Sequence, residues 1–153
     1  MPDVSLLYIH GFNSSPLSAK AQQMRKYFAD RGQGERVIIP RLPPAPQQAM
    51  AMLESAIAGA GPVALIGSSL GGFYATWLAE HHGLKAVLVN PAVRPWQLLD
   101  QVPEEMANYH TGEPYRFDKR WLDHLRHYEV AEMQHPENLL VLMQTGDETL
   151  DWH

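Results

Sequence analysis

The chain has 153 residues, of which 45% are apolar and 19% are charged, and its formal net charge is −5. These values predict one globular domain that covers residues 1–153, and they exclude an intrinsically disordered chain and a basic surface for nucleic acid. Cysteine is absent, which excludes disulfides, thiolate metal sites and a cysteine nucleophile.

Short apolar runs alternate with helical patterns along the chain, and this alternation is typical of a parallel sheet built from βαβ units. The runs that predict strands cover residues 4–9, 36–40, 63–66, 86–89 and 139–143. Between them, apolar residues recur at helical spacing in three stretches, which contain Met24, Leu53 and Phe73. Hydrophobicity within each strand is continuous, so we expect an α/β fold with helices on both faces of the sheet.

Residues 92–138 interrupt this alternation, with four prolines, many of the aromatic residues and no strand signal. A helix is predicted over residues 117–128, because Phe117, Trp121 and Leu125 share one side. A segment inserted after the end of a strand lies over the edge where open α/β sheets bind ligands, so we interpret residues 92–138 as a small cap. Four of its aromatic residues either shape a pocket or pack the core: Trp96, Tyr109, Tyr115 and Trp121.

The third predicted strand ends in a motif that carries chemistry. Residues 67–71 read Gly-Ser-Ser-Leu-Gly and fit G-x-S-x-G between a predicted strand and a predicted helix, which is the setting of a nucleophile elbow. Such a turn needs small flanking residues, and it exposes the central serine near helix N–H groups that stabilise an oxyanion. Ser69 is therefore the candidate nucleophile. The alternatives are an incidental serine in a tight turn and a phosphate-binding loop, although the P-loop lysine is absent.

A second signal follows the first predicted strand, where His10, Gly11 and Phe12 stand at the place of the other oxyanion-hole loop in this type of fold. We expect the backbone N–H groups of Phe12 and Leu70 to point at one substrate oxygen. His10 is interpreted as a structural histidine that braces the loop rather than as a general base.

Four motifs in this order, YIHGFNSS, GSSLGG, NPA and QTGDETLD, resemble the YqiA-like family of small bacterial α/β-hydrolase esterases over essentially the whole chain. The resemblance implies an α/β-hydrolase fold and a Ser-Asp-His triad that acts on esters or thioesters of modest acyl groups. Ser69 matches the nucleophile and Asp147 the acid, while Phe12 and Leu70 match the oxyanion-hole positions. Asp147 also follows the fifth predicted strand, from which an acid can orient a histidine. Asp151 is the competing acid, and in another interpretation both aspartates cap a helix.

The triad histidine is the part that the sequence does not supply in the expected place. In this fold the order is serine, acid, histidine, and the histidine that follows Asp147 is His153. The six residues after Asp147 are too few for a further helix and strand, which need roughly 30 residues. His124 and His127 predict a solvated helix face rather than a metal pair, and His110 could overhang Ser69 from the cap. We therefore expect a shortened hydrolase that lacks the last strand, helix and histidine loop.

The leading hypothesis is a cytoplasmic serine hydrolase that forms an acyl-enzyme on Ser69 and needs no cofactor or metal. Its partner would be a small ester or thioester, with no nucleic acid and no membrane, since the sequence has no signal peptide and no apolar run near the roughly 20 residues that span a bilayer. The alternatives are a non-catalytic hydrolase-fold protein that binds a partner, supported by the absent histidine, and a lipid or acyl-CoA carrier.

A sheet that lacks its last strand exposes an unpaired edge, and such edges favour pairing with another chain. We therefore expect copies of this chain to associate through that edge. Size-exclusion chromatography at high protein concentration should give an elution volume above the monomer mass, and a monomeric elution profile would contradict the expectation.

Overall fold

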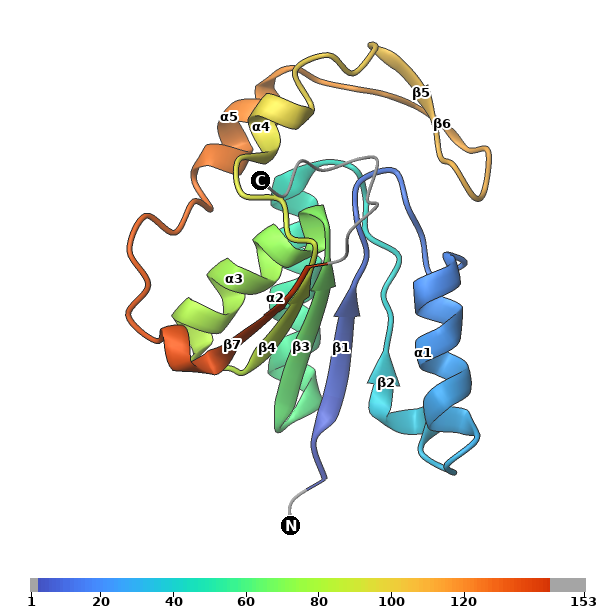
Figure 1. Ribbon diagram of the computed structural model, residues 1–153. Helices are drawn as coiled ribbons and strands as arrows, with labels where there is room; N and C mark the ends of the chain where they lie inside the picture. The colour runs from blue at the N-terminus through green and yellow to red at the C-terminus, as the bar shows by residue number, and fades with distance from the viewer. Residues whose placement is uncertain (1–2, 144–153) are drawn as a thin grey trace.

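A five-stranded parallel sheet forms the centre of the computed structural model, which describes residues 3–143 (Figure 1). The strand order is β2-β1-β3-β4-β7, and each neighbouring pair is parallel. The strands are β1 (Ser5–Ile9), β2 (Val37–Ile38), β3 (Val63–Ser68), β4 (Ala86–Val89) and β7 (Leu139–Leu142). All five predicted strands are confirmed, although β2 is shorter because the 3-10 helix η1 (Gly34–Arg36) precedes it directly.

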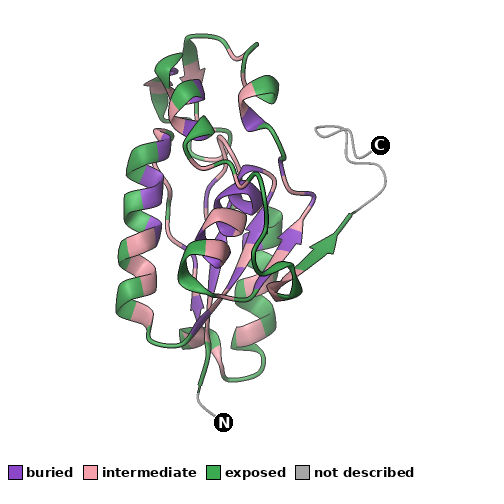
Figure 2. Cartoon of the chain, turned by 90° about the vertical axis from the view of Figure 1, so that its left-hand side faces the viewer, coloured by how far each residue is buried: buried purple, intermediate pink, exposed green. Residues whose placement is uncertain are grey.

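Helices cover both faces of the sheet, as the continuous hydrophobicity of the strands predicts. On one face, Leu7 and Leu65 belong to a core cluster formed with α2 (Pro46–Ala60) and α3 (Leu70–His82). On the other face, Tyr8 and the partly buried Ile66 pack with α1 (Ala19–Ala29). Figure 2 shows the buried residues gathered along the strands and the inner sides of these helices.

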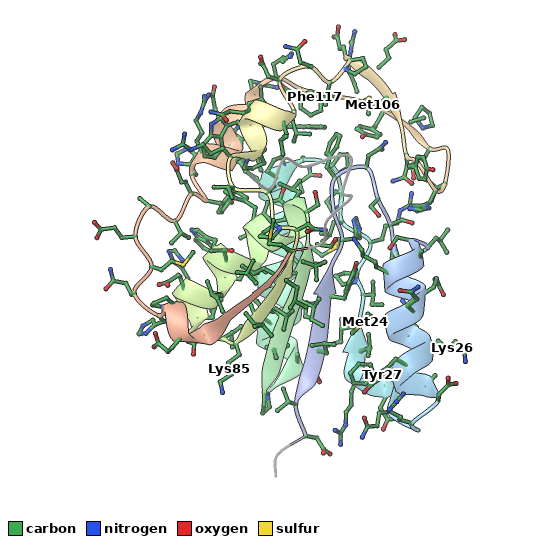
Figure 3. All side chains as sticks on the ribbon, viewed as in Figure 1. Met24, Lys26, Tyr27, Lys85, Met106 and Phe117 are labelled. Carbon is green, nitrogen blue, oxygen red and sulfur yellow. The ribbon has the colours of Figure 1, made fainter. Side chains whose placement is uncertain are left out.

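The α1 helix shows how an amphipathic sequence selects its inner face. Met24 packs against the small cluster on the α1 side of the sheet, whereas Lys26 lies on the outside and forms an ion pair with Asp30 at 2.7 Å (Figure 3). The helix begins after Ser18, whose side chain accepts a hydrogen bond from the Ala21 N–H and so satisfies one of its free donors.

On the face where α1 packs, the part of the sheet formed by β4 and β7 is only partly covered. Parallel register places Leu140 beside Val87 and Leu142 beside Val89, and these four side chains share the face on which α1 packs. Val87 and Val89 are partly exposed, while Leu140 and Leu142 are 56% and 48% exposed. Within residues 3–143, β7 is thus an apolar edge strand, and association of copies through it stays a prediction.

The segment between β4 and β7 forms the cap and arches over the carboxyl ends of the strands (Figure 1). The expectation that it contains no strand is wrong, because an antiparallel hairpin pairs Met106 with Tyr115. Each hairpin strand has only three residues, which is too short for an alternating pattern to stand out. The predicted helix over residues 117–128 is present in shorter form. The cap elements are α4 (Pro95–Leu98), β5 (Glu105–Ala107), β6 (Pro114–Arg116) and α5 (Arg120–Arg126), and the 3-10 helix η2 (Pro136–Asn138) leads into β7.

Apolar contacts fix the helical part of the cap to the body of the protein. Leu125 of α5 is fully buried in the main core, and Trp96 of α4 packs edge-on against Phe73 at 6.1 Å between ring centroids. The cap therefore shares the core of the sheet instead of forming one of its own. No helix within residues 3–143 is long and apolar enough to cross a bilayer.

Candidate active site

Ser69 lies in the turn between β3 and α3 and adopts a backbone conformation that disfavours residues other than glycine. Its φ is 56° and its ψ is −117°. The surrounding backbone holds this strained residue: the Ser69 N–H donates to the Val89 carbonyl at 3.1 Å, and its carbonyl accepts from Gly72 N at 3.0 Å and Ala92 N at 2.9 Å. Strain of this kind persists only where neighbouring structure enforces it, and it is concentrated at functional sites. The predicted strand–turn–helix arrangement around Ser69 is confirmed.

Close backbone packing explains the glycines around Ser69. A Cβ atom on Gly67 would lie 2.3 Å from the Gly71 carbonyl oxygen, and one on Gly71 would lie 2.0 Å from the Ile9 carbonyl oxygen. A Cβ atom on Gly72 would lie 2.7 Å from the Cβ atom of Pro91. These contacts join the elbow to the ends of β1 and β4, and so they connect motifs that are far apart in the sequence.

The loop after β1, residues 10–15, passes directly beside Ser69. A Cβ atom on Gly11 would lie 3.3 Å from the Cβ atom of Ser69. The next residue, Phe12, lines the same cavity as Leu70, the first residue of the 13-residue helix α3. The structure therefore brings together all the predicted site residues that it describes. The N–H groups of the first turn of α3 and its partial positive charge add an electrostatic preference for an anion.

His10 has the structural role that the sequence suggests. Its Nε2 atom accepts a hydrogen bond from the Leu42 N–H at 3.0 Å, so its Nδ1 atom, 2.9 Å from the Gly11 carbonyl oxygen, carries the proton. His10 is 4% exposed, and burial lowers the pKa of its imidazole below the usual value, which keeps the imidazole neutral. With both nitrogens bonded, His10 ties the start of the loop to the segment after β2 and has no lone pair left to take a proton from Ser69.

A cavity of about 320 Å³ opens beside this loop, between α2, the first turns of α3 and the cap hairpin. Apolar side chains such as Leu42, Met52 and Leu70 form much of its wall. Two charged lining residues, Arg41 and Glu113, form an ion pair that joins the segment after β2 to the hairpin. Such a volume, with a wall that is more apolar than polar, is typical of a site for a small organic ligand.

The aromatic residues of the cap divide between the two roles left open by the sequence. Tyr115 lines the cavity, whereas Trp96 packs on Phe73 and Trp121 packs on Phe117 at 5.1 Å. Tyr109 takes neither role and is 82% exposed. Another aromatic residue, Tyr74 of α3, lines the cavity although it is 2% exposed overall, and burial raises the pKa of its phenol, so it faces a ligand as a neutral group.

The remaining predicted site residue, Asp147, lies outside the described residues, as do its competitor Asp151 and the terminal His153.

Within residues 3–143 no histidine ring forms a hydrogen bond with Ser69. His81 stacks on Trp77 at 3.7 Å near the far end of α3. His110 packs against the exposed Tyr109. The described His, Asp and Glu side chains form no group of three that could hold a metal ion.

Several cavity residues were not predicted from the sequence. Arg41 follows a short strand in a proline-rich segment, and Asn108 and Glu113 belong to a hairpin that the hydrophobic pattern does not reveal. For Asn13 the sequence does carry a signal for a turn, because asparagine is favoured where the backbone adopts a positive φ. The φ of Asn13 is 58°.

Comparison with known proteins gives one family and several related structures. Residues 5–153 match the model of a family described as "Uncharacterised protein family (UPF0227)". A putative hydrolase from Agrobacterium vitis S4 is 14% identical with a TM-score of 0.66, covering 92% of this chain and 78% of that one. A structure reported for LipS and LipT, two metagenome-derived lipolytic enzymes, is 21% identical with a TM-score of 0.60, covering 92% and 71%. Est1E from Butyrivibrio proteoclasticus, with ferulic acid bound, is 12% identical with a TM-score of 0.54, covering 98% and 83%. These structures show that the chain has the α/β-hydrolase fold.

The packing of Gly71 against β1 predicts the effect of a single added methyl group. Gly71→Ala would force its Cβ atom into the Ile9 carbonyl oxygen, so we expect the free energy of unfolding to fall by about 1–3 kcal/mol or more. Gly59→Ala is the matched control, because a Cβ atom there meets nothing within 4 Å and alanine favours the helix by up to ~1 kcal/mol. Urea denaturation of both variants measures the difference, and equal stabilities would contradict the close approach at Gly71.

The buried neutral His10 predicts a stability that depends on pH. Burial lowers the pKa of His10 in the folded state. As the pH falls through the usual histidine pKa of about 6.5, His10 therefore takes up a proton in the unfolded chain but stays neutral in the folded chain. The free energy of unfolding should therefore fall on acidification below that pH. His10→Gln, whose amide oxygen can accept the Leu42 N–H, should show a weaker fall. Urea denaturation at pH 8 and pH 5.5 compares the two proteins, and parallel losses would show that His10 does not contribute.

Proposed function

Because the chain belongs to the YqiA-like family (UPF0227) and has the α/β-hydrolase fold, we propose that it is a serine hydrolase that cleaves carboxylic esters or thioesters through an acyl-enzyme on Ser69. The observation that carries the proposal is the strained Ser69, held at the start of α3 and directly beside Gly11. A turn that holds a serine at positive φ costs folding energy, and such strain is concentrated at functional sites.

The proposed reaction has two halves. In the first, the Ser69 Oγ atom forms a bond to the acyl carbon, and the carbonyl oxygen becomes an oxyanion that the N–H groups of Phe12 and Leu70 stabilise. Collapse of this intermediate breaks the bond to the alcohol or thiol, which leaves with a proton. In the second half, water attacks the acyl-enzyme, releases the acid and restores the Ser69 hydroxyl. Each oxyanion-hole donor is worth roughly 3–4 kcal/mol of transition-state stabilisation in well-studied hydrolases.

The proton that leaves Ser69 requires a general base. We propose a histidine oriented by Asp147, with Asp151 as the alternative acid, because Asp147 follows the last strand of the sheet in the sequence. His10 is unsuitable, since both of its ring nitrogens are occupied. The assignment of the acid rests on sequence position, as both aspartates lie outside the described residues.

The cavity beside the oxyanion-hole loop supports an acyl group of modest size. It adjoins Phe12 and Leu70, its wall is largely apolar, and its volume of about 320 Å³ is at the lower end for organic ligands. Its neutral Tyr74 and the paired charges of Arg41 and Glu113 offer polar contacts without a net charge. An uncharged short-chain ester is therefore the first substrate to test.

A second candidate function is binding without turnover. It is favoured by the lack of any hydrogen bond between Ser69 and a histidine ring within residues 3–143. A protein of this kind would bind an ester in the same cavity and release it unchanged. The two candidates differ in whether Ser69 reacts.

Reaction with a fluorophosphonate, read by intact mass and peptide mapping, tests the proposal. We expect one adduct on Ser69, no adduct on Ser69→Ala, and a full adduct on Ser55→Ala, which removes an exposed serine of α2 that does not line the cavity. Hydrolysis of p-nitrophenyl butyrate should fall on the order of 10³-fold or more in Ser69→Ala, because the nucleophile is lost. An adduct on another residue, or full activity of Ser69→Ala, would refute the assignment. Saturable ester binding with no adduct and no turnover would favour the binding protein.

A further inference from the structure

The cap hairpin holds the loop that carries the Phe12 N–H. The Tyr115 hydroxyl of β6 donates a hydrogen bond to Asn13 Oδ1 at 2.9 Å, and the Asn108 side-chain amide donates to the Ser14 carbonyl at 3.0 Å. These bonds fall on the two residues that follow Phe12 in the loop. The rest of the loop is held by the body of the protein, through His10 and the segment after β2.

The Phe12 side chain is enclosed by two aromatic rings from the same part of the cap. Its ring meets Tyr115 edge-on at 6.5 Å and Phe117 edge-on at 5.8 Å between centroids. Phe117 is 3% exposed and lies on the underside of the cap (Figure 3). Edge-to-face pairs of this kind have a preferred geometry, so they restrict where the Phe12 residue can lie.

The loop itself provides little to define its shape. A turn closes through the Ser14 N–H and the Gly11 carbonyl at 3.3 Å, with Phe12 and Asn13 as its central residues. Asn13 has a φ of 58°, a left-handed conformation that asparagine adopts more readily than most residues but that stays uncommon for any residue except glycine. A left-handed residue in a turn with a long hydrogen bond persists only where neighbouring structure holds it, because a change of backbone conformation would relieve the strain and turn the Phe12 N–H elsewhere. The contacts from the hairpin oppose such changes.

We propose that Tyr115 is a positioning residue of the oxyanion hole: its hydroxyl holds Asn13 and its ring holds Phe12, so that the Phe12 N–H stays directed at the space beside Ser69. The inference rests on the proposed function, because it gives Phe12 the role of an oxyanion donor. An oxyanion donor acts mainly in the transition state, so its displacement lowers kcat more than it raises KM. The cap thus contributes to the rate of the reaction as well as enclosing the cavity.

Tyr115→Phe removes the hydroxyl and keeps the ring. With p-nitrophenyl butyrate we expect kcat to fall about tenfold with KM within about twofold, because one positioning contact is lost and the cavity wall is kept. The matched control is Tyr109→Phe on the same hairpin, since that side chain is 82% exposed and its backbone N–H, which donates to the Asn13 carbonyl at 3.3 Å, remains. The control should keep the kcat and KM of the natural chain.

Nuclear magnetic resonance of the backbone amides gives a second readout that needs no turnover. In Tyr115→Phe the Phe12 and Asn13 amide signals should shift and their hydrogen exchange should accelerate, while the amides of β3 keep their signals. Unchanged Phe12 and Asn13 amides, or an unchanged kcat, would overturn the proposal. A natural chain with no turnover and no adduct on Ser69 would refute the proposed function instead, and the amide signals would then still decide whether Tyr115 positions the loop.

Asn13→Gly tests the same bond from the other side, and on its own it should lower kcat about as much as Tyr115→Phe, so it serves also if Tyr115→Phe does not fold. Glycine accepts the positive φ and removes the oxygen that the Tyr115 hydroxyl binds. If the hydroxyl acts through Asn13, adding Tyr115→Phe to Asn13→Gly should lower kcat by less than twofold further. Independent, multiplying losses in the double variant would show that Tyr115 acts elsewhere.

Discussion

The backbone of α3 packs directly on the end of β1, because Gly71 carries no side chain that would hold it away from the Ile9 carbonyl. This approach places the first turn of α3 beside the loop that leaves β1, and so it sets Ser69 against Gly11. Gly67 and Gly72 extend the same tight packing back into the turn and across to Pro91 after β4. The position of the elbow is therefore fixed by backbone against backbone, which leaves little freedom for adjustment.

The loop on the other side of Ser69 is held in a different way, by side chains from two separate parts of the protein. His10 ties its beginning to Leu42 through a neutral imidazole, while Tyr115 and Asn108 hold its middle from the cap. Hydrogen bonds of this kind have narrow geometric limits but are individually weak. The candidate site thus combines a rigid turn that carries Ser69 with a neighbouring loop whose geometry depends on the docking of the cap.

The elbow could be predicted from the sequence because all of its determinants are local. An apolar run, a glycine-rich turn and a helical pattern stand next to one another around Ser69, and each carries its own signal. The cap hairpin could not be predicted in this way, because each of its strands has three residues. The central residues, Met106 and Tyr115, are partly buried and the residues that flank them are exposed, so no apolar run marks either strand. The bond between Asn13 and Tyr115 joins residues 102 positions apart, and nothing in the composition of either segment indicates the pairing. The role of His10 was predicted from its place after β1, whereas its bond to Leu42 depends on the path of the chain after β2.

The same long separation has a consequence for the newly made chain. The bonds that hold the elbow are complete once Ala92 is available, whereas the loop beside it waits for Tyr115 and Phe117. Ribosomes add roughly 5–20 residues per second, and domains generally fold from the N-terminal side. For on the order of a second or more, a nascent chain would hold its serine turn without the cap that orders the neighbouring loop. In the order of biosynthesis, the loop of residues 10–15 would be the last part of the candidate site to reach its final arrangement.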